Sequence, residues 1–416
     1  MTRRERVLTA LSHREPDRLP VDFGSTTVTG MHVSCVAALR RHFGLEQRLV
    51  KIFEPSQCLG WLDEDLKTAL DIDTEALIQR KANYALVLDD WKPWRMDDGL
   101  EVLVPGNFHV TRDANGDTLL HPGGDTSLAP SGRMPAGGYF FDAIIRQQPI
   151  DETKLDPEDN VEEYGRFSEE DLGHFASAAQ AAQATGRAVV AKFGAGFGDI
   201  ANVPGVSLRE PKGIRDVAEW YMSIRSRPEY VHGVFSRQCE ILLDNLRRVN
   251  ERAGDCVDVI YLCGTDFGTQ KSTFCSEVTF RELWLPYYRQ VTDWIHGNTQ
   301  WKVFKHSCGS VVRFLDAFVG AGFDILNPVQ VSALGMEPEY LKSKYGDRLV
   351  FWGGGVDTQK TLAFGSPAEV REQVLGHAAI FGRGGGYVFN SVHNVQARTP
   401  LENVVAMFDA LRELRG

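Results

Sequence analysis

Short hydrophobic runs recur along the second half of the chain, and stretches with helical periodicity separate them. The runs are rich in β-branched and aromatic residues without polar alternation, which predicts strands buried on both faces. We expect such strands at residues 187–193, 257–262, 301–306, 323–328, 348–353 and 387–392. Repeated alternation of strand and helix indicates a parallel sheet. This many repeats favour an α/β fold of the (β/α)8 TIM-barrel type.

Capping residues mark the starts of several predicted helices. A capping box at Thr2 and Glu5 precedes the first helix, and the same pattern recurs at Ser366 and Glu369. Residues 399–402 combine a capping Thr, a first-turn Pro and a Glu, so the last helix is expected to follow them.

Residues 95–135 interrupt this rhythm. They contain alternating strand-like runs joined by a turn at Asn115-Gly116, which predicts a small β meander inserted into the barrel near its mouth. Residues 148–170 are acidic and are expected to form a solvated surface connection. We expect residues 1–416 to form one barrel domain that includes the insert.

The composition is that of an ordinary globular protein. The chain has 416 residues, of which 43% are apolar and 24% charged, and its net charge is −11. An acidic surface repels phosphate groups, so nucleic acid and anionic membranes are not expected as partners. The sequence shows neither a membrane span nor a signal-peptide core, and its seven cysteines contain no C-x-x-C pair. We therefore expect a cytoplasmic protein with free thiols.

The strongest chemical signal is the motif His306-Ser307-Cys308-Gly309, which lies between a predicted strand and a helix expected to begin near Gly309. Positions two apart in extended chain share a face, so His306 and Cys308 are expected to point together into the barrel mouth. Imidazole and thiolate are zinc ligands. The alternative is a buried Cys beside a hydrogen-bonded His.

His393 follows the last predicted strand and would reach the same mouth. Three ligands, His306, Cys308 and His393, would leave one coordination position open, as in catalytic zinc sites. The alternative for His393 is a loop residue that caps neighbouring carbonyls.

Other candidates follow the strands in the same way. Asp266 could bind metal, orient a ligand or exchange a proton with substrate, and capping a helix is its alternative role. We expect four further residues to contact substrate: Gln270, Asp357, Phe193 and Gly194.

Four segments, 264–270, 280–288, 306–330 and 399–413, together resemble the uroporphyrinogen decarboxylase superfamily. The likeness extends over residues 1–90 and 180–416. This superfamily has a (β/α)8 barrel and contains both decarboxylases and zinc-dependent corrinoid methyltransferases. Its decarboxylase branch carries an arginine-rich N-terminal signature that binds propionate groups, whereas the corresponding residues 19–26 here contain no arginine. The resemblance therefore favours the methyltransferase branch.

In thiol-methylating members of that branch, zinc is bound by His-x-Cys and a late Cys. His306 and Cys308 match the first two ligands, and His393 stands at the late position. A carboxylate–Glu–His pattern of methoxyaromatic O-demethylases has spacings that recur at Asp357, Glu372 and His393. Helical periodicity places Glu372 opposite the buried stripe, so we expect its side chain to face solvent.

The resemblance implies transfer of a methyl group from a methylated, methoxyaromatic donor to a corrinoid carried by a separate protein. Zinc would act as the Lewis acid, and Asp266 would position or protonate the leaving group. A decarboxylase acting on a carboxylated substrate and a non-catalytic barrel are the competing hypotheses. We expect a monomer or a homodimer.

Overall fold

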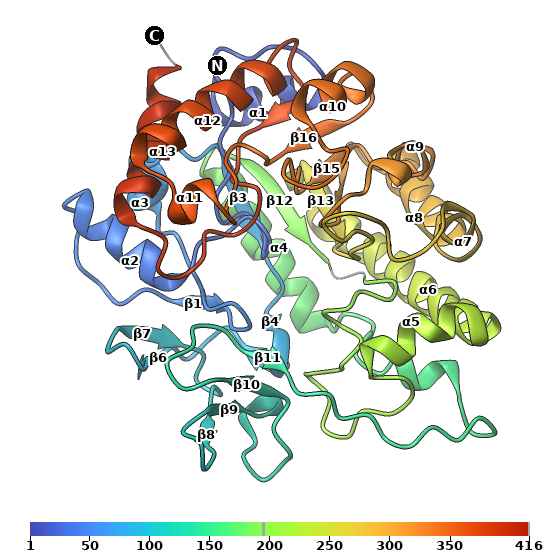
Figure 1. Cartoon of the computed structure of the whole chain (residues 1–416). Helices are drawn as coiled ribbons and strands as arrows, with labels where there is room; N and C mark the ends of the chain where they lie inside the picture. The colour runs from blue at the N-terminus through green and yellow to red at the C-terminus, as the bar shows by residue number, and fades with distance from the viewer. Residues whose placement is uncertain (194–195, 415–416) are drawn as a thin grey trace.

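A parallel sheet of seven strands forms the centre of the molecule (Figure 1). The computed structural model describes residues 1–193 and 196–414. Neighbouring strands pair in the order β17-β16-β15-β14-β13-β12-β3, so each strand lies beside the next one in the chain. Their bounds are β3 Thr74–Leu77, β12 Ala188–Lys192, β13 Val259–Cys263, β14 Lys302–His306, β15 Ile325–Asn327, β16 Val350–Trp352 and β17 Tyr387–Val388.

All the strands expected in the second half of the chain are present as β12 to β17, each shorter than its hydrophobic run. The sequence pattern missed β3, because its short sequence TEAL carries a buried Glu75 within it. That carboxylate is neutralised by an ion pair with Lys67.

Residues 20–22 connect the two edges of the sheet. The Phe389 N–H donates to Pro20 O (2.8 Å), and the Asp22 N–H donates back to Phe389 O (2.9 Å). On the other side, the Asp73 N–H donates to Val21 O (2.8 Å), just before β3. The sheet is therefore curled, which is consistent with a TIM-type barrel. Val21 forms a parallel bridge with Phe389 in this segment.

Asp22 belongs to this connecting segment, and its side chain is buried inside the curled sheet. It accepts hydrogen bonds from Thr74 Oγ1 (2.6 Å) and from Trp352 Nε1 (2.8 Å). Trp352 is 330 residues away in the sequence, so this contact ties the start of the chain to β16.

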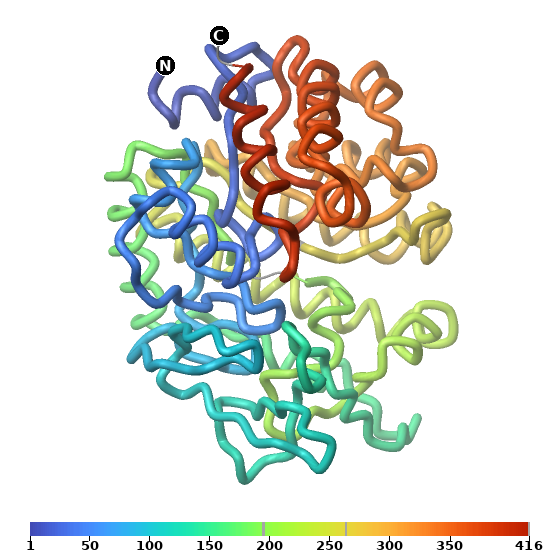
Figure 2. Tube along the Cα trace, turned by 60° about the vertical axis from the view of Figure 1, so that its left-hand side comes forward, coloured from blue at the N-terminus to red at the C-terminus, as the bar shows by residue number. Residues whose placement is uncertain are grey.

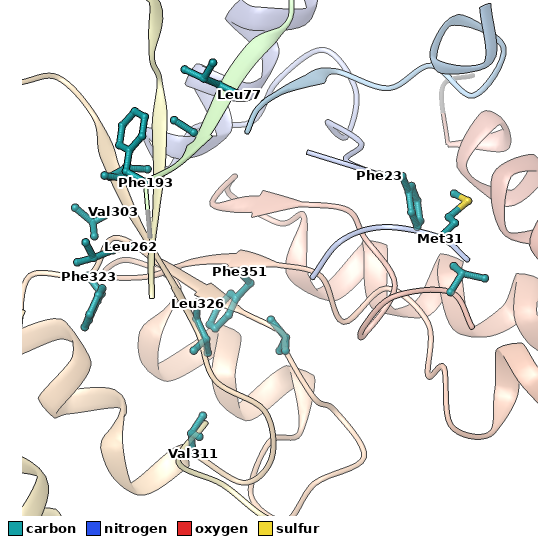
Figure 3. Close-up of a cluster of buried hydrophobic side chains, with 14 of the residues drawn as sticks. Phe23, Met31, Leu77, Phe193, Leu262, Val303, Val311, Phe323, Leu326 and Phe351 are labelled. Atoms are coloured by element: carbon teal, nitrogen blue, oxygen red, sulfur yellow. The ribbon is translucent and has the colours of Figure 1, made fainter. Parts of the chain in front are cut away.

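Alternate residues of each strand belong to two different buried clusters. One cluster contains only strand residues and a few N-terminal side chains, so it fills the inside of the curled sheet: Val7, Leu11, Val28, Ala188, Val190, Val259, Tyr261, Phe304, Ile325, Val350, Trp352 and Val388. The residues between them pack outward against the helices (Figure 3), among them Phe193, Leu262, Val303, Leu326 and Phe351. The same two-residue alternation determines which side chains at the ends of the strands point into the interior.

Thirteen α-helices are present in the described residues, most of them surrounding the sheet (Figure 1). They are α1 Arg3–Leu11, α2 Val33–His42, α3 Glu64–Ala69, α4 Glu169–Ala184, α5 Val217–Ser226, α6 Pro228–Ala253, α7 Glu277–Leu283, α8 Leu285–Asn298, α9 Leu315–Gly320, α10 Pro338–Tyr345, α11 Thr361–Phe364, α12 Pro367–Phe381 and α13 Leu401–Glu413. The capping boxes predicted at Thr2 and Ser366 are both confirmed.

One predicted helix start and one predicted helix cap are wrong. The helix expected near Gly309 begins only at Leu315, after a 3-10 turn, because the Gly309 and Ser310 amides donate to Gln330 Oε1 and Thr269 O instead. Thr399 does not cap α13: its hydroxyl donates to Gln396 O (2.9 Å), and Pro400 occupies the capping position.

Antiparallel strands lie between β3 and β12 and gather at one end of the molecule (Figures 1 and 2). They are β4 Lys81–Ala82 with β5 Leu86–Val87, β6 Lys92–Arg95 with β7 Glu101–Val104, and a four-stranded sheet of β8 Val110–Arg112, β9 Thr118–Leu120, β10 Gly132–Met134 and β11 Asp142–Ala143. A further pair near the N-terminus joins β1 Ile52–Glu54 to β2 Leu59–Gly60. The role of residues 95–135 as an insert that shields the mouth stays a prediction.

Residues 148–170 are not wholly solvated, contrary to the prediction. Asn160 and Val161 are each 4% exposed. The Asn160 amide bonds both ways with Ile214, donating to its carbonyl and accepting from its N–H at 2.8 Å each. Within the described residues, no helix is long and apolar enough to cross a membrane.

Shortening Phe304 to Ala is expected to destabilise the protein by about 3–5 kcal/mol, because its ring fills the interior cluster without exposure. Ring centroids of Tyr261 and Trp352 lie 5.5 and 5.4 Å away and would border the resulting cavity. Urea unfolding followed by far-UV circular dichroism measures the change. Phe364→Ala is the control, because that ring is 85% exposed and its loss should cost less than about 0.5 kcal/mol.

Candidate functional site

Three potential metal ligands meet where the strands end. Phe304 of β14 points into the interior of the sheet. His306, the last residue of the strand, lies two positions later and therefore points the same way. Cys308 follows in the next loop, and its Sγ lies 3.4 Å from His306 Nε2. His393 comes from the loop after β17, and the ligand atoms of the three residues lie within 4.8 Å of one another. The structure therefore brings together the three residues that were expected to meet.

A second layer of hydrogen bonds fixes the His306 ring. Its Nδ1 lies 2.6 Å from Asn327 Oδ1. The amide of Asn327 is itself oriented, because its Nδ2 donates to Trp352 O (2.8 Å). His306 Nδ1 must then carry the proton, which leaves the lone pair on Nε2, the nitrogen facing Cys308.

Asp266 holds the Cys308 loop in place. Its Oδ1 accepts the Cys308 N–H (2.7 Å) and lies 3.7 Å from His306 Nε2. The loops after β13 and β14 approach so closely that a Cβ on Gly309 would stand 2.4 Å from the carbonyl carbon of Gly268. Gly309 also has φ +86°, so only glycine fits there without strain. This explains the glycine that follows the His-x-Cys pair.

The His393 ring crosses the His306 ring edge-on, with centroids 5.5 Å apart and an interplanar angle of 71°. Its backbone is held by Ser391, whose hydroxyl donates to His393 O (2.6 Å). A short turn at the end of the last strand thus delivers the second imidazole to the cluster.

Burial keeps both imidazoles neutral. Desolvation lowers the pKa of His306 to about 3 and that of His393 to about 4. The same desolvation, reinforced by Asp266, raises the pKa of the Cys308 thiol well above its usual value. Neutral imidazoles are competent ligands as they stand, and a divalent cation would favour the thiolate. This donor set, two nitrogens and one sulfur, fits zinc.

A cavity of about 770 Å³ adjoins the cluster, a size typical of small-molecule sites. Asp266, His306 and His393 are among its lining residues. The rest of the wall comes from widely separated segments, including Thr27, Phe53, Glu54, Tyr84, Phe141, Asp142, Tyr164, Lys192, Phe197, Asp199 and Tyr261. The cavity thus combines aromatic surface with a few charged groups.

Comparison with known proteins identifies the family. The sequence profile described as uroporphyrinogen decarboxylase (URO-D) matches residues 159–414, more than half of the chain. The chain belongs to the uroporphyrinogen decarboxylase family.

Individual relatives match over shorter stretches. The uroporphyrinogen decarboxylase of Psychromonas ingrahamii is 34% identical over 73 residues, which cover 18% of this chain and 20% of that protein. The uroporphyrinogen decarboxylase of Alkalilimnicola ehrlichii is 29% identical over 102 residues, covering 24% and 26% respectively. These matches therefore span only about a fifth to a quarter of the relatives' length.

A solved structure, a methyltransferase from Methanosarcina mazei, superposes over 100% of both chains with a TM-score of 0.55 and 14% sequence identity. At this identity the likeness shows a shared fold. It also places the whole of this uroporphyrinogen decarboxylase family member, beyond the profile match, within that fold.

Several other predicted site residues lie outside the cavity wall. Gln270 is exposed and donates to Gln359 Oε1 (2.9 Å). Asp357 is 4% exposed, and its Oδ1 accepts the Gln359 N–H (2.8 Å), so it closes a local turn. Glu372 is exposed, as its helical position predicted. None of the three is among the lining residues of the cavity or the metal-ligand group.

Of the two residues Phe193 and Gly194, which were expected to contact substrate, the structure describes only Phe193. Gly194 lies outside the described residues. Phe193 borders the cavity but is only 2% exposed, and its ring packs in the outer cluster beside Phe175 and Trp301 at 5.1 and 5.9 Å.

Sequence reasoning missed three polar residues of the site: Lys192, Asp199 and Asn327. Lys192 and Asn327 could have been found from the alternation of their strands, because each stands two residues beyond an interior position, Val190 and Ile325. Asp199 lies in an irregular segment after β12 and has no such signal.

Asp199 should make stability depend on pH. Burial, together with the charge of Asp266, raises the pKa of this carboxyl to about 7. The folded chain then binds the proton more tightly than the unfolded chain, so this group lowers the free energy of unfolding as pH rises from about 4 to about 7. Asp199→Asn cannot lose a proton, and its Tm should rise relative to wild type by about 3 °C or more between pH 5 and pH 8.

Thermal melts of both proteins across this range provide the measurement. Asp347→Asn is the matched control, because its side chain is 83% exposed and its Tm difference should stay flat. A flat profile for Asp199→Asn as well would contradict the raised pKa.

Proposed function

We propose that this family member is a zinc-dependent methyltransferase. It would move a methyl group from a methylated, methoxyaromatic donor to a corrinoid held by a separate protein. The observation that supports this most is the meeting of His306, Cys308 and His393, with ligand atoms within 4.8 Å, beside a cavity of about 770 Å³.

The donor set suits a catalytic metal better than a structural one. Structural zinc sites have four protein ligands, whereas three ligands leave a position for substrate. In the described residues, the group contains three side chains, and two of them face the cavity. When bound there, zinc supplies Lewis acidity that makes an ether oxygen a better leaving group.

The protein's own residues would carry out the remaining tasks. Asn327 orients His306, and Asp266 positions the Cys308 loop. Methyl transfer to a reduced corrinoid would break the methyl–oxygen bond and leave both of its electrons on the oxygen, which must then take up a proton. We assign that proton to Asp199, because its raised pKa keeps it protonated up to about pH 7 and it lines the cavity.

Aromatic side chains would hold the ring of the donor. Tyr164, Phe197 and Tyr261 line the cavity near the charged groups. Stacking and edge contacts with such rings favour a flat aromatic substrate over an aliphatic one. The fold of the Methanosarcina mazei methyltransferase supports the same type of reaction.

Decarboxylation is the second candidate, because the matching relatives carry that name. The sequence of residues 19–26 weighs against a tetrapyrrole substrate. It contains no arginine, and its single carboxylate, Asp22, is buried.

Replacing a metal ligand should remove the metal. Purified wild type is expected to contain about one zinc per chain by elemental analysis, and His306→Ala and His393→Ala should each contain far less. Both variants should also lose methyl transfer from methoxylated phenols to cob(I)alamin, followed by the cobalamin absorbance. His42→Ala is the control, since that imidazole is exposed outside the cavity. Unchanged zinc in both variants would refute the site.

Removing the residue that orients a ligand should weaken the metal without abolishing it. Asn327→Ala is expected to lower zinc affinity by about 10–100-fold, because His306 then loses its fixed ring position. Competition with a chromophoric chelator measures this affinity. Asn403→Ala removes a comparably buried amide, which bonds Leu362 O and Gly365 O, and should leave zinc affinity unchanged. Equal affinities of Asn327→Ala and wild type would contradict the orienting role.

A further inference from the structure

We propose that the substrate carries an anionic group, a carboxylate, and that Lys192 is the residue that binds it. This deepens the proposed function, because it adds a carboxylate to the groups of the methyl donor that the protein recognises. It rests on that function only for the aromatic ring of the donor. The evidence is the position of Lys192, its sparse contacts and the state of the acidic groups around it.

Lys192 is placed by the same alternation that places His306. Ala188 and Val190 of β12 fill the interior of the sheet, so Lys192 is the next inward-facing residue and the last one of the strand. It is paired in register with Tyr261 of β13, and both residues line the cavity. A cation therefore stands in the same wall as His306.

Among residues 1–193 and 196–414, the ammonium group has few partners for a charge in such a position. Its Nζ contacts Thr27 Oγ1 at 3.1 Å and lies 5.6 Å from the centre of the Tyr261 ring. Among the described residues, no carboxylate oxygen comes within 4.0 Å of it. Desolvation lowers the pKa of Lys192, and a hydroxyl does not compensate a partly desolvated charge. An anionic group of a bound ligand would compensate this charge.

Another lysine on a neighbouring strand shows what a satisfied buried ammonium looks like. Lys305 is fully buried, and its Nζ donates to Thr265 O (2.7 Å) and His306 O (2.6 Å). Three aromatic rings also surround it, with centroids 5.0–5.8 Å away. Lys305 lies outside the cavity wall, whereas Lys192 lies within it.

Three acidic side chains of the cavity have their own hydrogen-bond donors. Glu54 accepts from the Ser56 and Gln57 N–H groups, and Glu163 is paired with Arg215. Asp266 accepts from Cys308, as described above.

Glu54 and Asp199 both raise the pKa of Lys192 electrostatically, although Asp199 retains its proton up to about pH 7. Neither of them forms an ion pair with the Lys192 ammonium in the described residues, so this group has room for a carboxylate of the ligand. A carboxylate placed there, with its ring against Tyr261, would point the rest of an aromatic molecule into the cavity.

The test compares binding of 4-methoxybenzoate and its neutral analogue 4-methoxybenzamide by isothermal titration calorimetry. No corrinoid is added, so the measurement is independent of methyl transfer. Wild type should bind the carboxylate at least about tenfold more tightly than the amide, since a hydrogen bond between two charged groups is stronger than one to a neutral group. Lys192→Met should remove this preference, and Lys192→Arg should keep part of it.

Lys81→Met is the matched control, because this exposed lysine also borders the cavity and its loss should change the preference less than about twofold. Circular dichroism melts check that every variant is folded. If Lys192→Met keeps the preference, if wild type has none, or if neither compound binds wild type, the proposal is wrong. Selective binding without methyl transfer would instead contradict the proposed function and leave this inference standing.

Discussion

The site depends on one constraint: a side chain at the end of each parallel strand must face either the interior or the helices. Interior positions such as Val190, Phe304 and Ile325 pack inside the curled sheet, so the next inward residue of each of these three strands stands at the end of the sheet where the cavity and the donor cluster lie. That rule brings Lys192, His306 and Asn327 to one level. A shift of one residue in any of these strands would turn its functional side chain into the outer core.

The loops that follow the strands supply two further side chains of the site. Cys308 and Asp266 come from adjacent loops that touch at Gly268 and Gly309, and the contact between them is a backbone-to-side-chain hydrogen bond. Positioning of the sulfur is therefore a property of two loops packed together. Rigid support of this kind keeps donor atoms close even where burial disfavours charge, as the raised pKa of Cys308 shows.

Much of the fold and part of the site could be predicted from the sequence. Strands β12 to β17 were recognisable because buried parallel strands are continuous apolar runs, and His306 and Cys308 were recognisable from their two-residue spacing. Strand β3, with its buried Glu75, resembles a polar turn until Lys67 is seen beside it. The substrate contacts expected for Asp357 and Gln270 stay predictions; in the structure these side chains bond locally, because the ends of strands carry residues that close turns as well as residues that face a cavity.

The contact between Asp22 and Trp352 has a consequence for how the site is assembled. Trp352 also accepts the amide of Asn327, which orients His306, so one relay of hydrogen bonds runs from the beginning of the chain to the donor cluster. His393 arrives only with the last loop before α13. During translation, this arrangement cannot form until the segment that carries His393 has been synthesised and has folded back beside the segment that carries Asp22.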